Sequence, residues 1–103
     1  METKVLYRYE IEYSNADDPE TGVRLLELPV IRETANSYFV KRFYWGGKPR
    51  RVSKTAHDTY AYNTKDKALN HFIRRTSTRI RWFEYWTNEC EKAIKLAEEM
   101  RAK

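Results

Sequence analysis

Cationic side chains lie next to aromatic ones over a short stretch in the middle of the chain. Six cations lie within fourteen residues, beside Tyr44 and Trp45 and around Gly46 and Gly47. Basic groups neutralise phosphates, and neighbouring rings can stack on bases. The pattern predicts a surface for an anionic partner, although a charged hairpin whose glycines only make the turn fits the same residues. The predicted binding residues of this stretch are Lys41, Arg42, Trp45, Lys48, Arg50, Arg51 and Lys54.

A second group of cations falls in a stretch with helical spacing. At about 100° per residue, Arg74 and Arg81 lie opposite the apolar stripe, as phosphate-tracking or simply solvated side chains would. Arg75 and Arg79 lie along one flank of the stripe, with the tryptophans of the same segment. That flank suits a protein interface or a nucleotide base, unless the tryptophans pack internally and the arginines merely cover them. We predict all four arginines as binding residues.

The charge of the chain is concentrated in its centre. Residues 41–81 carry twelve basic and two acidic side chains, whereas residues 1–40 have a net charge of −4 and residues 82–103 of −1. The whole chain has a net charge of +5. A central basic block favours nucleic acid, nucleotides or an acidic protein face as partners, and a solvated surface is the alternative.

The residues that could support catalysis or metal binding lack the necessary spacing. The acidic cluster, Asp17, Asp18 and Glu20, has no EF-hand spacing and is typical of a solvated turn. The single cysteine, Cys90, falls on the apolar stripe and is expected to be buried rather than nucleophilic. No zinc-binding spacing and no phosphate-binding glycine loop is present. We therefore expect neither an enzyme, nor a resident metal, nor a cofactor.

The elements that must position the cations begin with a strand over residues 4–13. Apolar and polar side chains alternate there with a period of two, which predicts one buried face. The face expected to be buried comprises Val5, Tyr7, Tyr9, Ile11 and Tyr13, and the opposite face carries Arg8, Glu10 and Glu12.

Further strands are predicted over residues 23–33, 37–44 and 50–55, with a strand-like fragment at 60–62. Pro29 has no N–H to donate, so the second strand is expected at a sheet edge or with a bulge there. The sequence thus predicts an antiparallel meander of three to four strands within residues 1–62.

A long helix over residues 64–102 follows, with Thr64 as its N-cap and without Gly or Pro after it. Its 38 residues from Lys65 would extend about 57 Å, beyond the reach of a small sheet. The exposed half then needs a partner, and a homodimer is the simplest, although a helical hairpin with a break near Thr87 remains the alternative. The predicted oligomer interface consists of Phe83, Trp86, Cys90 and Ile94.

Length and composition predict one α+β domain over residues 1–103. Apolar residues make up 41% of the chain and charged residues 34%, which is typical of a globular protein. No apolar run approaches the roughly 20 residues of a membrane span, and no signal peptide is expected. The single cysteine fits a reducing cytoplasm.

Three stretches together resemble small uncharacterised bacteriophage proteins. The stretches are Arg51-Val52-Ser53-Lys54-Thr55, then Tyr60-Ala61-Tyr62, then Thr64-Lys65-Asp66-Lys67-Ala68-Leu69 leading into Phe72-Ile73-Arg74-Arg75. The resemblance implies a phage accessory protein, of the kind that often blocks host machinery, anti-CRISPR proteins included. The implied partner is a host defence protein, or the nucleic acid or nucleotide that it binds. The alternatives are a small DNA- or RNA-binding regulator and a structural virion or assembly protein.

Overall fold

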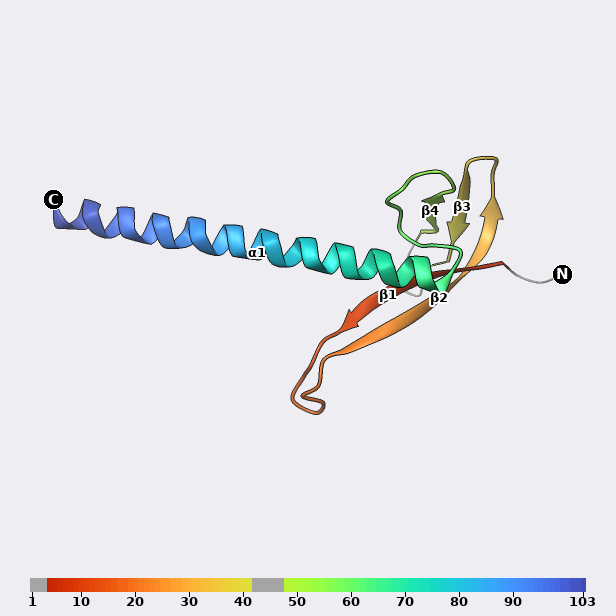
Figure 1. Cartoon of the computed structure of the whole chain (residues 1–103), viewed down its shortest axis with the longest axis horizontal. Coiled ribbons are helices and arrows are strands. Elements are labelled where there is room, and N and C mark those ends of the chain that lie inside the picture. The colour runs from red at the N-terminus through yellow and green to blue at the C-terminus, as the bar shows by residue number, and fades with distance from the viewer. Residues whose placement is uncertain (1–3, 42–47) are drawn as a thin grey trace. The chain divides into compact units, whose positions relative to one another are not determined.

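The computed structural model describes residues 4–41 and 48–103 of the chain. The described residues form β1 (Val5–Glu12), β2 (Gly22–Glu33), β3 (Ser37–Val40), β4 (Arg50–Ser53) and α1 (Lys65–Ala102) (Figure 1). The predicted α+β class, an antiparallel meander followed by one long C-terminal helix, is confirmed. The chain divides into two compact units, which we call unit 1 (Met1–Phe72) and unit 2 (Ile73–Lys103).

Unit 1 is built on a sheet with the strand order β1-β2-β3-β4, in which each strand pairs antiparallel with the next. Tyr62 adds a bridge to the free edge of β1, because its backbone exchanges two hydrogen bonds of 2.7 and 2.9 Å with that of Tyr7. The strand-like fragment predicted at residues 60–62 is therefore present as a single bridge. The connection after β4 thus returns to the opposite edge of the sheet, next to β1.

Strand β2 lies between β1 and β3, so Pro29 is not at a sheet edge. The other predicted solution, a bulge, is present between Val30 and Arg32, where the pairing with β3 shifts by one residue. Pro29 contributes only its carbonyl oxygen, which accepts a hydrogen bond of 3.1 Å from the N–H of Lys41. The missing N–H of proline is thus tolerated next to an irregular part of the ladder.

A small apolar core closes unit 1. Its fully buried members come from all four strands and the returning connection, and are Leu6, Leu28, Val40, Val52 and Ala61. Tyr38 and Tyr60 pack partly buried against this cluster. Aromatic side chains at the border let a short chain exclude water from a core of few residues.

The alternation in β1 is present, but the expectation for its buried face is wrong. Leu6 is only 1% exposed, and it lies on the same face as Arg8 and Glu10. The face with Tyr7 and Tyr9 is half-buried. Leu6 pairs with Leu28 across the ladder and joins the core, while Arg8 packs its guanidinium 4.2 Å from the centre of the Tyr60 ring at the border of that core.

Helix α1 begins as predicted. The hydroxyl oxygen of Thr64 accepts a hydrogen bond of 3.2 Å from the N–H of Lys67, so Thr64 is the N-cap. No break occurs near Thr87, whose hydroxyl instead donates to the carbonyl of Phe83 at 2.8 Å within the continuous helix. A helical hairpin within the chain is therefore excluded. No helix in the described residues is long and apolar enough to cross a membrane.

The two units differ in how far their apolar side chains are buried. The buried residues of α1 are Ala68 and Phe72, which both belong to unit 1. From Ile73 onward the large apolar side chains are exposed, and Phe83, at 62%, is typical of them. Unit 2, taken by itself, is therefore an amphipathic helix whose apolar stripe faces solvent.

Candidate binding surface

The cations of strand β4 separate onto the two faces of the sheet. Successive side chains of a strand point to opposite faces, so Arg50 and Arg51 diverge. Arg50 lies opposite Val40 in the ladder, on the side of the core, and Arg51 lies opposite Phe39, on the outer side. The predicted central pair of binding residues is therefore not brought together by the fold.

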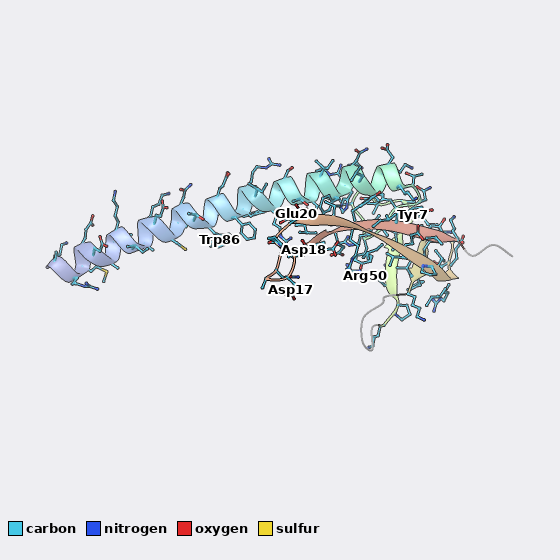
Figure 2. The ribbon with its side chains drawn as sticks, turned by 90° about the horizontal axis from the view of Figure 1, so that it is seen from below. Tyr7, Asp17, Asp18, Glu20, Arg50 and Trp86 are labelled. Carbon is cyan, nitrogen blue, oxygen red and sulfur yellow. The ribbon has the colours of Figure 1, made fainter. Side chains whose placement is uncertain are left out.

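On the core side, Arg50 packs on an aromatic ring. Its guanidinium carbon lies 4.7 Å from the centre of the Tyr60 ring, to which Arg8 also packs. Arg8 donates a hydrogen bond of 2.8 Å to the backbone carbonyl of Tyr60 and forms an ion pair of 2.7 Å with Glu10. Tyr60 thus anchors the returning connection, and Arg50 contributes to that anchoring (Figure 2 labels Arg50 on β4).

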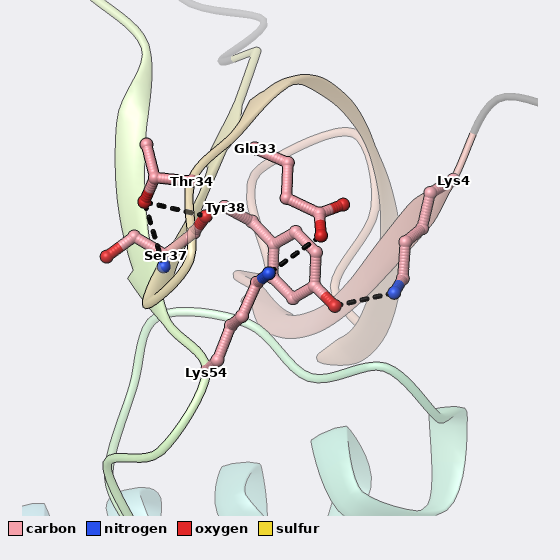
Figure 3. Close-up of polar contacts among 6 residues, drawn as sticks. All are labelled: Lys4, Glu33, Thr34, Ser37, Tyr38 and Lys54. Carbon is pink, nitrogen blue, oxygen red and sulfur yellow. Dashed lines mark hydrogen bonds and ion pairs between the residues drawn. The ribbon is translucent and has the colours of Figure 1, made fainter.

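Lys54 is engaged at the other end of the same face. Its ammonium forms an ion pair of 2.7 Å with Glu33, and it lies 4.8 Å from the centre of the Tyr38 ring (Figure 3). Lys4 donates a hydrogen bond of 2.5 Å to the Tyr38 hydroxyl. The hydrogen bond from Lys54 holds the pKa of Glu33 below its usual range, and the hydrogen bond to Tyr38 raises the pKa of Lys4. Lys54 is therefore neutralised by the protein itself.

The outer side of strands β2, β3 and β4 carries a row of three side chains, which we call the Arg–Phe–Arg row. Arg32 pairs with Phe39, and Phe39 pairs with Arg51, so the three residues are cross-strand neighbours on one face. The guanidinium of Arg32 lies 4.6 Å from the centre of the Phe39 ring. Arg51 is oriented by its Nε, which donates a hydrogen bond of 2.7 Å to the buried Ser37 hydroxyl.

The Arg–Phe–Arg row combines charge with a flat apolar surface. Arg32 and Arg51 are exposed, and Phe39 is half-buried between them. Within residues 4–41 and 48–103, no ion pair joins either arginine to a carboxylate of the protein. Two planar forks beside one ring can bind anionic oxygens while the ring contacts an apolar or aromatic group.

The remaining predicted residues of the central stretch contribute less to a defined site. Lys41 and Lys48 are exposed, the former directly after β3 and the latter before β4. Arg42 and Trp45 lie outside the described residues. Two of the seven predicted cationic and aromatic positions are thereby left as predictions.

The predicted arginines of the helix belong to unit 2. Arg74, Arg79 and Arg81 are exposed and Arg75 is partly buried. The Arg–Phe–Arg row, by contrast, belongs to unit 1.

Unit 2 also carries a cluster of three rings. The ring centres of Trp82 and Tyr85 are 6.0 Å apart, those of Tyr85 and Trp86 are 5.4 Å apart, and both pairs meet edge to face. Both tryptophans are 57% exposed. The cluster is a rigid apolar surface on a single helix.

The predicted interface residues of unit 2 share one property, which is exposure in the single chain. They are Phe83, Trp86, Cys90 and Ile94. The expectation that Cys90 is buried is wrong for the single chain, because no other element of unit 2 covers its side of the helix. The stripe is present as predicted, and it is exposed along the described residues of unit 2.

One histidine of the described residues, His71, lies near a carboxylate. The Nε2 atom of His71 lies 3.9 Å from a carboxylate oxygen of Asp58, and the ring of Tyr62 lies 5.0 Å away, centre to centre. The contact fixes the connection after β4 against the first turns of α1. An imidazole at that distance is beyond a hydrogen bond.

The acidic cluster forms the turn between β1 and β2 (Figure 2). The side-chain oxygen of Asn15 accepts hydrogen bonds from the N–H groups of Asp17 and Asp18, at 2.9 and 2.8 Å. The N–H of Glu20 in turn donates to the carboxylate of Asp18 at 3.2 Å. Residues 4–41 and 48–103 contain no group of three His, Cys, Asp or Glu side chains that could hold a metal ion.

Sequence reasoning missed three residues of these surfaces. Arg32 and Phe39 could be paired only with the register of β2 and β3, which the bulge determines. Tyr85 carried a signal that was available, because Tyr85 and Trp86 follow Trp82 by three and four residues, and both spacings bring side chains together on a helix.

Comparisons with known proteins add no relative. No protein-family model matches the chain, and neither a curated protein nor a solved structure matches it.

Proposed function

We propose that this protein acts by binding rather than by catalysis, and that the Arg–Phe–Arg row is the centre of its docking surface. The observation that supports this proposal is the row itself, since two exposed guanidinium groups flank one ring on a rigid sheet face. Exposed arginine beside an aromatic ring is the combination enriched where proteins bind partners.

The partner is an anionic surface. Three cations lie on or next to the outer side of the sheet, namely Arg32, Arg51 and Lys41, and all three are exposed. Lys54 is paired with Glu33, and Arg50 lies on the opposite face of the sheet, so both are expected to contribute little. A surface of this kind recognises phosphate or carboxylate oxygens, and the fork of arginine adds geometric specificity.

We further propose a phage-type accessory protein that inhibits a host defence component in the cytoplasm. This part rests on the resemblance described for residues 51–75. In this setting the row docks on an acidic face of a defence protein, or on the nucleic acid or nucleotide that the defence protein holds.

A small DNA- or RNA-binding regulator is the second candidate, and the alternation of cation, ring and cation favours it. Bases stack on exposed rings while neighbouring cations follow the phosphates. If three phosphates are neutralised, affinity falls roughly 20- to 40-fold between 50 and 200 mM salt. A protein partner bound through an aromatic contact loses far less affinity over that range.

The test is a pull-down from host lysate with the tagged full-length chain, with and without nuclease treatment. We expect Arg32→Ala with Arg51→Ala to abolish capture. Arg50→Ala is the matched control, because Arg50 is the sequence neighbour of Arg51 on the opposite face. Equal capture by the double variant and the wild type would refute the docking surface. Nuclease-sensitive capture would favour the regulator over the inhibitor.

A further inference from the structure

The exposed stripe of unit 2 follows a seven-residue repeat with alternating steps of three and four. In heptad notation, position a is occupied by Ile73, Ile80, Thr87 and Ile94, and position d by Thr76, Phe83, Cys90 and Ala97. The repeat continues for nearly four heptads without a break in α1. A repeat of 3.5 residues sustained over this length is the pattern of a coiled coil.

The same stripe is exposed in the single chain. Ile73, Ile80 and Ile94 at position a are all more than half exposed, as is Phe83 at position d. Soluble monomers rarely expose a contiguous apolar stripe of this length. An isolated helix also gains little from propensity alone, so most helical stability must come from packing of the apolar face.

We propose that a second copy of this chain covers the stripe, and that the two helices form a parallel, in-register, two-stranded coiled coil from Ile73 to Ala97. Isoleucine occupies three of the four a positions, as in parallel two-stranded coiled coils, although leucine, which is usual at d in those, is absent here. The predicted interface residues agree with this repeat, since Phe83, Cys90 and Ile94 lie at d or a positions and Trp86 lies at the flanking g position.

Charge at the flanking positions selects the parallel orientation. We call the a and d positions from Ile73 to Ala97 the seam. The e positions carry Glu84, Glu91 and Glu98, whereas the one charged g position between Ile73 and Ala97 is Arg79. In a parallel pair, each g position faces the e position of the next heptad of the second copy, so Arg79 meets a glutamate. In an antiparallel pair, e positions face each other and glutamates are opposed. Such like-charge contacts are destabilising.

The surface of unit 2 already contains a hollow of the required kind. A shallow depression is lined by Ile80, Phe83, Glu84 and Thr87, together with Asn88. The first four are an a, a d, an e and the next a position. Four residues in this arrangement form the hole that receives a d-position side chain of a facing parallel helix. In register, that side chain is Phe83 of the second copy.

The parallel register places the two copies of Cys90 opposite each other at a d position, and this gives a direct probe. With oxidised glutathione added, two thiols lose two protons and two electrons to form one disulfide, and the glutathione disulfide is reduced to two thiols. We expect a covalent dimer of the full-length protein. In a Cys90→Ser background, Ala97→Cys is also expected to cross-link to itself.

The second cysteine makes orientation testable. In an antiparallel pair, the symmetry axis crosses the helices at one point, so positions seven residues apart cannot both face their own copies. Self-cross-linking at both positions supports the parallel register, and cross-linking at one position only overturns it. Lys95→Cys in the Cys90→Ser background is the control for random collision, because position 95 lies outside the seam.

Mass measurement by light scattering tests the dimer itself. We expect twice the 12.5 kDa of one chain at high concentration, with dissociation on dilution because Thr76, Thr87 and Ala97 make the seam thin. A mass of one chain from about 1 µM to about 1 mM would overturn the proposal.

Two substitutions of equally exposed apolar residues complete the test. Ile94 is 59% exposed and lies in the seam, whereas Leu96 is 60% exposed and lies outside it. We expect Ile94→Lys to raise the dissociation constant roughly 100-fold or more, because two ammonium groups would be buried together. Leu96→Lys should leave it nearly unchanged. Equal effects of the two variants would contradict a seam at position a.

Discussion

Unit 1 and unit 2 use similar side chains in different ways. In unit 1, leucine and valine from four strands meet in a core and are almost fully buried. In unit 2, isoleucine, phenylalanine and tryptophan lie along one helix and remain more than half exposed. Residue type alone therefore does not determine burial. The strands of unit 1 supply packing partners for one another, whereas a single helix has no such partner within itself.

The largest expected effect is on the free energy of unfolding, and it compares a leucine of unit 1 with a leucine of unit 2. Leu28→Ala is expected to destabilise unit 1 by about 2–5 kcal/mol, because it opens a cavity in a core of few residues. Leu96→Ala should change stability by less than about 0.5 kcal/mol. Urea unfolding followed by near-UV circular dichroism measures both. Similar losses in the two variants would mean that Leu96 has a partner.

The second prediction concerns the flank of the seam. Trp86→Ala should raise the dissociation constant of the dimer about tenfold, since a large ring beside the seam loses its contacts. Sedimentation at several concentrations is the measurement. Trp82→Ala is the control within the same aromatic cluster, and it should have little effect because Trp82 lies on the outer side of the helix. A larger effect of Trp82→Ala than of Trp86→Ala would place the interface on the Trp82 side of the helix instead.

The third prediction addresses the residue at which the helix begins. Thr64→Ala removes the acceptor for the N–H of Lys67 and should cost about 1 kcal/mol of stability. Thr64→Ser keeps a hydroxyl and should recover most of it. Because the cap belongs to unit 1, we expect the loss in thermal unfolding of the sheet and no change in the dimer dissociation constant. A change in dimerisation would show that the units are coupled.

The smallest expected effect is the acid dependence of unit 1. The ion pair with Lys54 lowers the pKa of Glu33 from its ordinary value of 4.5, so its stabilisation is present above that pH. It is lost as the pH falls through the lowered folded-state pKa. We expect a small decrease in melting temperature over that range, and a smaller one in Lys54→Met. High salt should weaken the effect, since both groups are at the surface.

Much of the fold was predictable because its signals are local. The absence of Gly and Pro after Thr64 and the capping hydroxyl fix the helix, and alternation fixes the strands. The buried face of β1 was not predictable from alternation, because tyrosine can sit at a border while Leu6 alone reaches the core. The separation of Arg50 and Arg51, by contrast, follows from the strand period and could have been stated from sequence.

The Arg–Phe–Arg row depended on information that is not local. Its members come from three strands, and the bulge in β2 decides which residue of that strand joins them. The positions of the seam of unit 2 could be predicted from the sequence spacing alone. Their exposure could not, because it depends on whether another part of the chain covers them. Local periodicity thus predicts elements, while register and coverage decide which surfaces are available.

The irregularity after Val30 has a consequence for the sign of the outer surface. It is the one extra residue that turns Arg32 outward beside Phe39 and leaves Glu33 on the other side with Lys54. If the ladder ran regularly from the Val30–Val40 pair, Ile31 would lie opposite Phe39 and Arg32 would lie opposite Tyr38, on the side of Lys54. Deleting Ile31 removes the extra residue and still leaves Arg32 opposite Phe39 and Glu33 opposite Tyr38. The charge on each face is therefore expected to survive loss of this residue, whereas regular pairing that kept it would bring an arginine to a lysine.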